Sequence, residues 1–236
     1  MRPNTAQKPQ ALEIETLTYP AQLARLGGVI PEPVLQLAAK SAGRDDRDFG
    51  WRKRLAGKRF FAIDSSPGPG VDAVVDIAAP LEDIRKALPS PAYGGILCSQ
   101  VLEQARDPFA VAAHIAAILA SGGLLFVQAP LAKALPASGQ DRWRFTLSGL
   151  STLFEGLEIA DVFYSGNGND VAYRVKNQGK ADGSPEAQML AARTFEAHLP
   201  QSESEAMVRK VKDKRHLSRI YVPVTVLNVL FRKPRG

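Results

Sequence analysis

The stretch DPFAVAAHIAAILASGGLLFVQ, residues 107–128, decides the fold class because a helix and a strand follow each other directly in it. Its apolar residues first recur at helical spacing, after an aspartate that can cap the helix and a proline in the first turn. Ser121, Gly122 and Gly123 then predict a stop, and the continuous apolar run over 124–128 is typical of a buried parallel strand. The stretch therefore predicts an α/β protein.

The same alternation continues on both sides of this stretch. Residues 59–64 and 94–99 are predicted strands, with a short helix over 80–88 between them. Two late runs, 157–164 and 171–175, predict an antiparallel pair. Short connections between such elements favour a Rossmann-like, doubly wound sheet that is mostly parallel and has an antiparallel last strand.

The N-terminal part of the chain contains a further predicted strand. Residues 11–16 alternate apolar and polar side chains, so we expect them to form the first strand of the sheet. Residues 21–42 show helical spacing interrupted by two prolines, and the charged residues 43–58 are expected to form an exposed insertion.

The overall composition suits a globular protein with one core. The chain has 236 residues, of which 45% are hydrophobic, and its single cysteine, Cys98, excludes an intrachain disulfide framework. Three scattered histidines do not suggest a metal site, so we expect none. No run approaches the roughly 18 apolar residues that cross a bilayer, which favours a cytoplasmic location, with peripheral attachment to a membrane as an alternative.

The positive charge of the chain is concentrated at its C-terminus. Residues 209–235 hold nine Lys or Arg and one Asp, a local charge of +8, so the net charge of +6 leaves −2 for the remainder. We expect an α/β domain over 1–177 and a C-terminal extension over 178–236, with a basic helix and an apolar closing run. A basic segment is commonly a solvated face, but residues 207–235 could also contact a protein partner or an anionic membrane surface. The rest of the chain does not favour a nucleic-acid partner.

Asp64 is the strongest candidate for a ligand-binding residue. It ends the predicted strand 59–64 and precedes the turn-forming residues SSPGPG at 65–70. Ligands of an open α/β sheet bind beyond the carboxyl ends of the strands. A carboxylate there can accept both hydroxyls of a ribose, as nucleotide-type cofactors require, while capping of its own loop is the alternative role.

Three motifs resemble those of the class I S-adenosylmethionine-dependent methyltransferases of the so-called type 11 group. They are FAIDSSPGPGVD at 61–72, QVLE at 100–103 and DRWRFT at 141–146, in the order that the family shows. The resemblance covers roughly residues 11–164 and implies a sheet that binds S-adenosylmethionine.

The resemblance also implies roles for individual residues. Asp64 would bind the ribose, Asp76 and Ile77 would lie near the adenine, and Ser99 and Gln100 would lie beside the methionine portion. With the strand that would lead into the cofactor loop, the implied cofactor-binding residues are Glu13, Glu15, Asp64, Ser65, Asp76, Ile77, Ser99 and Gln100. Trp143 and Arg144 would lie on the substrate side, and the candidate catalytic residues are Asp141 and Glu103.

The chain departs from the family after its first predicted strand. Where the family turns on glycines, residues 15–18 read Glu-Thr-Leu-Thr, and the effect of Glu15 on a bound cofactor depends on where its charge points. The leading hypothesis is an S-adenosylmethionine-dependent methyltransferase that methylates an oxygen of a small molecule or glycan. The alternative is a catalytically weak or inactive methyltransferase-like subunit that acts through a protein partner. A nicotinamide-dependent oxidoreductase is disfavoured because Gly-x-Gly-x-x-Gly is missing at the required place.

Overall fold

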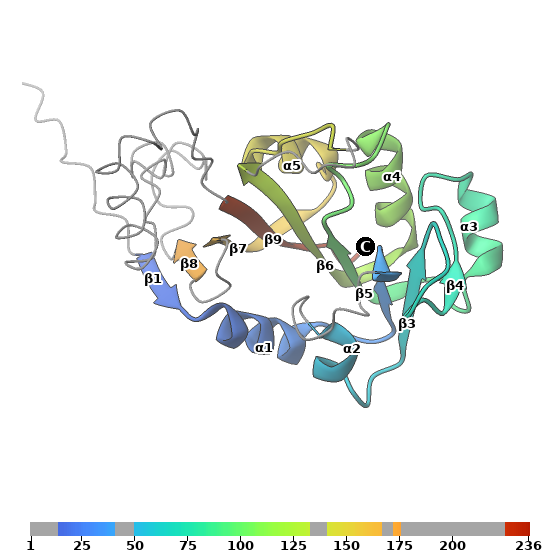
Figure 1. Cartoon of the computed structure of the whole chain (residues 1–236), viewed down its shortest axis with the longest axis horizontal. Coiled ribbons are helices and arrows are strands. Elements are labelled where there is room, and N and C mark those ends of the chain that lie inside the picture. Colours follow the sequence, from blue (N-terminus) through green and yellow to red (C-terminus); the bar gives the residue numbers. More distant parts are fainter. Residues whose placement is uncertain (1–13, 41–49, 133–140, 167–171, 176–224) are drawn as a thin grey trace, which may run out of the picture.

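One mixed sheet of nine strands forms the centre of the computed structural model, which describes residues 14–40, 50–132, 141–166, 172–175 and 225–236 (Figure 1). The strands are β1 (Ile14–Leu17), β2 (Val34–Gln36), β3 (Phe60–Asp64), β4 (Ala73–Val74), β5 (Tyr93–Ser99), β6 (Leu119–Ala132), β7 (Glu158–Gly166), β8 (Ala172–Val175) and β9 (Thr225–Arg232). The helices are α1 (Tyr19–Val29), α2 (Trp51–Arg54), α3 (Leu81–Ala87), α4 (Pro108–Ile118) and α5 (Leu147–Leu153). Among the described residues no helix has the length and apolar character needed to cross a membrane.

The strand order is β1-β8-β7-β9-β6-β5-β2-β3-β4. β2 pairs in parallel with β3 and β5, β3 with β4, and β5 with β6. β9 lies antiparallel between β6 and β7, and β7 and β8 form the predicted antiparallel pair. The predicted α/β class, with a mostly parallel sheet and an antiparallel last strand, is therefore confirmed.

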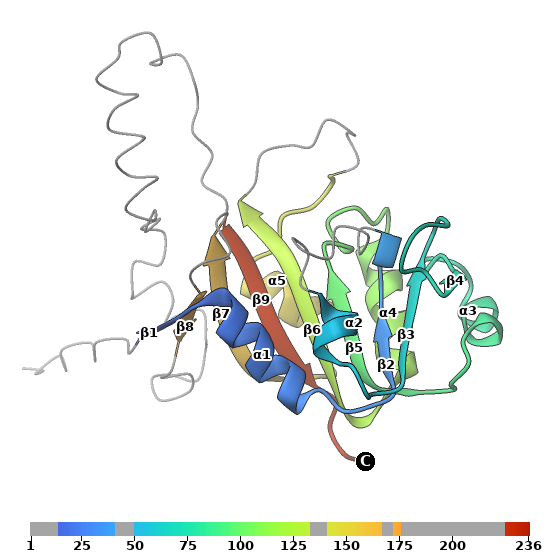
Figure 2. The ribbon, with the colours of Figure 1, turned by 60° about the horizontal axis from the view of Figure 1, so that its bottom comes forward.

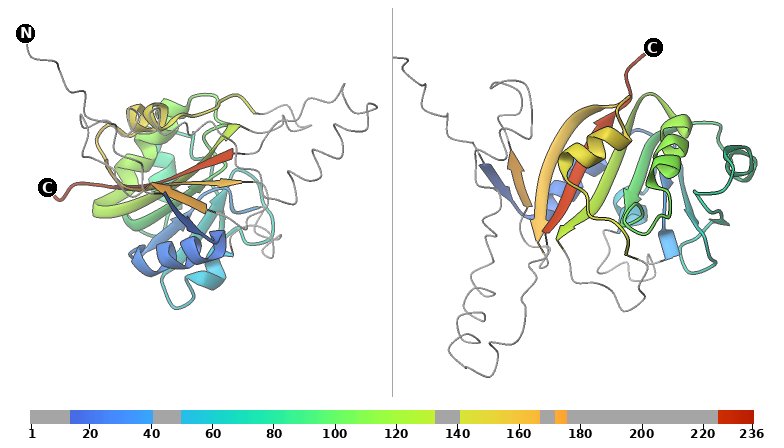
Figure 3. Two further views of the ribbon diagram at one scale, coloured as in Figure 1. Left: turned by 90° about the vertical axis from the view of Figure 1, so that its left-hand side faces the viewer. Right: turned by 90° about the horizontal axis from the view of Figure 1, so that it is seen from above.

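Helices cover both faces of the sheet, and the side chains of β6 show how the two layers of core arise (Figures 2 and 3). Successive residues of a strand point to opposite faces. Leu124 and Phe126 therefore pack with α1 and α2, where the Trp51 ring lies edge-on to Phe126 at 5.6 Å between centroids. Leu125 and Val127 pack with α4 and α5 on the other face. Burial on both faces explains the continuous apolar run in the sequence.

The closing segment of the chain corrects the expected domain division. Residues 225–232 form β9 in the interior of the sheet, and Leu227, Val229 and Phe231 are fully buried. The expected boundary at residue 177 therefore does not separate this segment from the α/β domain. Leu227, Val229 and Phe231 are therefore not part of the expected docking surface, whereas the side chain of Arg232 is exposed. The rest of the expected extension up to residue 224 lies outside the described residues.

A second correction concerns the helix expected over 21–42. α1 ends at Val29, and after the two prolines residues 34–36 form β2, a central strand. The chain before β2 lies directly against β5, since a Cβ on Gly94 would come within 2.5 Å of the Glu32 carbonyl oxygen and one on Gly95 within 2.4 Å of Ile30 Cγ2. These glycines are required by that close approach, so the structure explains their presence.

Two further expectations need adjustment. The glycine stop expected after α4 is not used, because the helix ends at Ile118 and β6 begins at once, with Gly122 and Gly123 inside the strand. The expected exposed insertion over 43–58 is only partly described, and its described part contains α2, whose Trp51 is 2% exposed and belongs to the core.

A buried network of polar side chains joins β9 to its neighbours. Asn228 Nδ2 donates to Ser165 Oγ of β7 at 3.0 Å, and its Oδ1 accepts from Gln128 Nε2 of β6 at 2.9 Å. Gln128 Nε2 also lies 2.6 Å from the hydroxyl of Tyr19 on α1. Because Asn228 is fully buried, removing it leaves buried partners without their hydrogen bonds.

Replacing Asn228 by alanine tests the central position of β9. We expect Asn228→Ala to lower the free energy of unfolding by about 2–4 kcal/mol, since two buried polar groups lose a partner at roughly 1–3 kcal/mol each. Urea unfolding followed by circular dichroism measures this loss. Arg232→Ala, at an exposed position of the same strand, is the matched control and should change the stability by less than about 0.5 kcal/mol. Equal, small effects of both changes would show that β9 is not part of the core.

Candidate functional site

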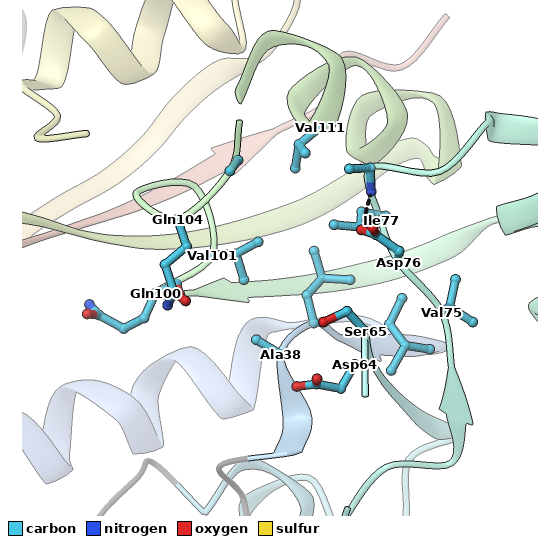
Figure 4. Close-up of a pocket in the computed structure, with 14 residues that line it drawn as sticks. Ala38, Asp64, Ser65, Val75, Asp76, Ile77, Gln100, Val101, Gln104 and Val111 are labelled. Carbon is cyan, nitrogen blue, oxygen red and sulfur yellow. Dashed lines mark hydrogen bonds between the residues drawn. The ribbon is translucent and has the colours of Figure 1, made fainter. Parts of the chain in front are cut away.

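A cavity of about 260 Å³ lies at the carboxyl ends of β2, β3, β4 and β5 (Figure 4). β3 and β4 follow β2 on one side of the sheet, whereas β5 and β6 continue on the other, so the order of strands reverses at β2. Such a switch point is where open α/β sheets bind ligands. The cavity is lined by Leu37, Ala38, Ile63, Asp64, Ser65, Val75, Asp76, Ile77, Ala78, Gln100, Val101, Gln104, Ala105 and Val111.

The lining combines apolar walls with two carboxylates. Figure 4 shows Val111 of α4 above the cavity, Asp64 below it and Val75 at its right-hand side. Asp64 is the last residue of β3, after the buried Ala62 and Ile63, and Asp76 belongs to the exposed loop after β4, where its Oδ1 accepts the backbone N–H of Ala78 at 2.9 Å. Apolar walls suit a flat ring, and carboxylates suit hydroxyl or amine donors at its edge.

Two lining residues have strained backbones. Ala38, after β2, has φ of 55° and Gln100, after β5, has φ of 56°, and among the described residues only these two non-glycine residues have positive φ. This conformation costs about 1–2 kcal/mol for a residue with a Cβ. Strain of this kind gathers at functional sites, where the surroundings enforce it. Here the backbone N–H of Gln100 donates to the Gln128 carbonyl at 3.0 Å, and Gln104 Nε2 donates to the Gln100 carbonyl at 2.9 Å.

The carboxylate of Asp64 is fixed by three hydrogen bonds. Its Oδ2 accepts the backbone N–H of Lys40 at 3.0 Å, and its Oδ1 accepts the backbone N–H and the hydroxyl of Ser66 at 3.0 and 3.1 Å. The Lys40 ammonium in turn donates to Ser66 Oγ at 3.0 Å. Asp64 therefore both lines the cavity and caps its own loop, which joins the two roles that the sequence left open.

The structure brings most of the expected cofactor-binding residues together. Asp64, Ser65, Asp76, Ile77 and Gln100 all line the cavity, although their contacts with a cofactor stay predictions. Ser99 ends β5 just before Gln100 but is not part of the lining. Its hydroxyl is buried and has no hydrogen-bond partner among the described residues.

The expected position of Glu15 in the cofactor loop is wrong. Glu15 lies on β1 at the far edge of the sheet, with five strands between β1 and β2. At about 4.8 Å per strand the two are roughly 29 Å apart, too far for a side chain to reach the cavity. Glu13, expected on the same strand, lies outside the described residues.

β2 is the strand that leads into the loop beside the cavity. The residues that follow it are Leu37, Ala38, Ala39 and Lys40, so the loop again starts without glycine, but at different positions from those expected. Leu37 and Ala38 were missed as site residues. The signal that could have identified them is the short apolar run of β2 directly after two prolines.

The DRWRFT motif docks on the loop after β5. The backbone N–H groups of Arg142 and Trp143 donate to the Glu103 carbonyl at 2.7 and 3.1 Å, and Trp143 Nε1 donates to the Ala105 carbonyl at 2.8 Å. Since Ala105 lines the cavity, the motif lies beside it. The indole of Trp143 is 38% exposed, so it offers an aromatic surface next to the site.

The two candidate catalytic acids lie beside the cavity, and neither lines it. The Asp141 side chain is buried and forms an ion pair with Arg144, whose Nη2 lies 2.6 Å from Asp141 Oδ2. Glu103 is 1% exposed. The hydrogen bond that Arg144 donates to Asp141 and, more weakly, the charge of Glu103 raise the pKa of the Arg144 guanidinium. Arg144 is expected on the substrate side, but its guanidinium is paired with Asp141 and is also affected by the charge of Glu103.

The fold corresponds to that of known methyltransferases. A protein from Bacillus halodurans, assigned as a methyltransferase, superposes with a TM-score of 0.53 at 12% identity over 91% of this chain and 98% of that one. This chain has the fold of the S-adenosylmethionine-dependent methyltransferases. A methyltransferase from Archaeoglobus fulgidus also matches, with a TM-score of 0.49 at 13% identity over 91% of this chain and 92% of that one. No protein-family model and no curated protein matches the sequence.

A further match is an N-methyltransferase structure that contains a cofactor product. It is NodS from Bradyrhizobium japonicum in complex with S-adenosyl-L-homocysteine, with a TM-score of 0.47 at 16% identity over 66% of this chain and 83% of that one. At these identities the likeness concerns the methyltransferase fold alone. Among the described residues of this methyltransferase-fold chain, no three His, Cys, Asp or Glu side chains gather as metal ligands would.

Replacing Arg144 tests the charge cluster formed by Asp141, Arg144 and Glu103 beside the cavity. We expect Arg144→Leu to lower the free energy of unfolding by about 2–3 kcal/mol, because Asp141 would stay buried without its cation. A fully buried pair would cost about 3–5 kcal/mol, but the Arg144 side chain is partly exposed. Thermal unfolding at neutral pH measures the loss. Arg106→Leu, at an exposed position of the neighbouring loop, should have little effect. A loss below about 0.5 kcal/mol for Arg144→Leu would contradict the cluster.

Proposed function

We propose that this protein binds S-adenosylmethionine in the cavity at β2 and transfers its methyl group to a small acceptor. The observation that supports this most is the position of the cavity at the strand switch point, where Ala38 and Gln100 hold strained backbones beside Asp64. In this proposal Asp64 binds the ribose. Asp76 and Ile77 contact the adenine, and Gln100 lies beside the methionine portion.

The described residues fit the nucleoside part of this cofactor. The volume of about 260 Å³ lies just below the roughly 300–1,000 Å³ of common ligand pockets, which suits a nucleoside with the remaining portion extending toward Gln100. The exposed carboxylate of Asp76 has acceptor positions for an adenine amine. When bound, S-adenosylmethionine supplies an activated methyl group, so the chain itself must mainly orient the acceptor in line with it.

The acceptor that we propose is an oxygen of a small molecule or glycan. Among the described residues that line the cavity, Asp64 and Asp76 are the only ionisable ones, and both have cofactor roles in this proposal. Asp141, the expected base, is bound to Arg144. A small-molecule hydroxyl acidic enough to ionise near neutral pH needs no base from the protein, and it therefore suits this site better than an alcohol hydroxyl of a glycan, which needs one.

A second candidate function is a weak or inactive methyltransferase-like subunit that acts through a protein partner. It is favoured by the loop after β2, where Ala38 has a strained conformation that glycine would adopt freely and Lys40 already contacts Asp64. The basic segment for a partner or an anionic membrane surface would be residues 207–235, without the core residues of β9. Cofactor binding without release of S-adenosylhomocysteine in the presence of acidic hydroxyl acceptors would favour this function.

The first test is calorimetric titration with S-adenosylhomocysteine. We expect the wild-type chain to bind it, and Asp64→Asn to weaken binding at least about tenfold, because a hydrogen bond to a charged acceptor contributes about 1.5–3 kcal/mol. Asp83→Asn on the exposed face of α3 is the matched control and should leave binding unchanged. Equal affinity of Asp64→Asn and wild type would contradict the proposed site.

The strained loop gives a second test of binding. We expect Ala38→Gly to strengthen S-adenosylhomocysteine binding several-fold, because glycine relieves the positive φ and allows closer approach of the backbone. Its stability should change by no more than about 1 kcal/mol, since the relief of strain and the flexibility of glycine offset each other. The control is Ala39→Gly, at a buried neighbour with ordinary φ, which should lose stability without a gain in affinity. Weaker binding by Ala38→Gly would refute the role given to this loop.

A further inference from the structure

We propose that Lys40 and Ser66 restrict the recognition of ribose, so that Asp64 accepts one ribose hydroxyl where a free carboxylate would accept two. This inference rests on the proposed function and adds a determinant of specificity to the same site. It starts from the hydrogen bonds that Asp64 already makes within the chain.

The acceptor capacity of Asp64 is nearly used. A carboxylate offers about four lone-pair positions on its two oxygens. The backbone N–H of Lys40 takes one on Oδ2, and the backbone N–H and hydroxyl of Ser66 take two on Oδ1. With these donors from the described part of the chain, one position on Oδ2 is left for a ligand, whereas the two hydroxyls of a ribose together need two.

Lys40 strengthens this occupation through Ser66. Its ammonium can only donate, so the Ser66 oxygen, 3.0 Å away, must accept from it. The hydroxyl hydrogen of Ser66 is then directed to Asp64 Oδ1, 3.1 Å away. Two charges of opposite sign are thus connected through one hydroxyl, which disfavours its rotation away from Asp64.

The path of the lysine side chain supports the same arrangement. A Cβ on Gly68 would lie 2.8 Å from Lys40 Cγ, so the lysine stem packs directly on the loop that follows Asp64. The ammonium is therefore held across this loop by contact along the stem as well as by its hydrogen bond. Removing the Ser66 hydroxyl frees one acceptor position, and removing the lysine charge lets the hydroxyl rotate away.

The experiment is calorimetry of the full chain with S-adenosylhomocysteine and with its 2′-deoxy and 3′-deoxy analogues. Because Asp64 accepts only one ribose hydroxyl in the wild type, we expect one of the two deoxy analogues to bind with an affinity within about twofold of that of S-adenosylhomocysteine. The other analogue, which lacks the accepted hydroxyl, should bind more weakly. Ser66→Ala should bind S-adenosylhomocysteine about 3- to 10-fold more tightly and should disfavour both deoxy analogues by a similar factor. Lys40→Met should shift affinity in the same direction by less, and Lys53→Met, an exposed lysine of α2, should not shift it.

The outcomes separate this inference from the proposed function. If the wild type binds S-adenosylhomocysteine but loses at least fivefold with each deoxy analogue, or if Ser66→Ala keeps the wild-type pattern, the inference is wrong and the cofactor site stands. If neither the wild type nor Ser66→Ala binds S-adenosylhomocysteine, the proposed function fails together with the inference. Binding by Ser66→Ala alone would contradict the proposed function of the natural chain, while supporting the restriction that Ser66 imposes on Asp64.

Discussion

The parallel pairing of β2 with β3 on one side and β5 on the other is the constraint on which the site depends. It brings the carboxyl ends of three strands to one edge, so Ala38, Asp64 and Gln100 meet although 62 residues separate the first from the last. The pairing is possible only because Gly94 and Gly95 leave room for the chain before β2. Ala38 and Gln100, which have positive φ, lie in the bends that follow these two strands. The pairing of the strands therefore determines the geometry of the site.

The sheet is completed from the other end of the chain. β9 fills the gap between β6 and β7, and its buried Asn228 joins both through side-chain hydrogen bonds. On the face of β7 that α1 covers, Asp161 is 4% exposed and pairs with Arg25 of α1, which fixes that helix against the sheet. Only the carboxylate of this pair is buried, because the Arg25 side chain is 36% exposed. The apolar residues of β9 are thus structural, whereas most of the basic residues for which a docking role is expected lie outside the described residues.

Sequence patterns predicted the regular parts of this fold and Asp64. α4, β3, β5 and the pair β7–β8 follow from periodicity and turn residues, because each has enough residues to show a pattern. β2 has three residues and follows a helix, so its apolar run predicts more helix, and the cofactor loop is then expected at Glu15. The sequence of β9 predicts an extension, because a strand that returns from a distant segment has no local signal for its partners. The motif suggests Asp141 as a base because a motif does not show burial. In the structure Asp141 is buried and paired with Arg144.

The electrostatics of the site favour binding over acid–base chemistry. Asp64 is fixed by backbone and side-chain donors, and Asp141 is neutralised by Arg144, so the carboxylates act through geometry and charge. We propose that this edge of the sheet binds the cofactor. A crystal structure of the full chain grown with S-adenosylhomocysteine is the most direct test. We expect density for the nucleoside between Asp64, Asp76 and Gln100. Clear density elsewhere, or an empty cavity at saturating ligand, would contradict it.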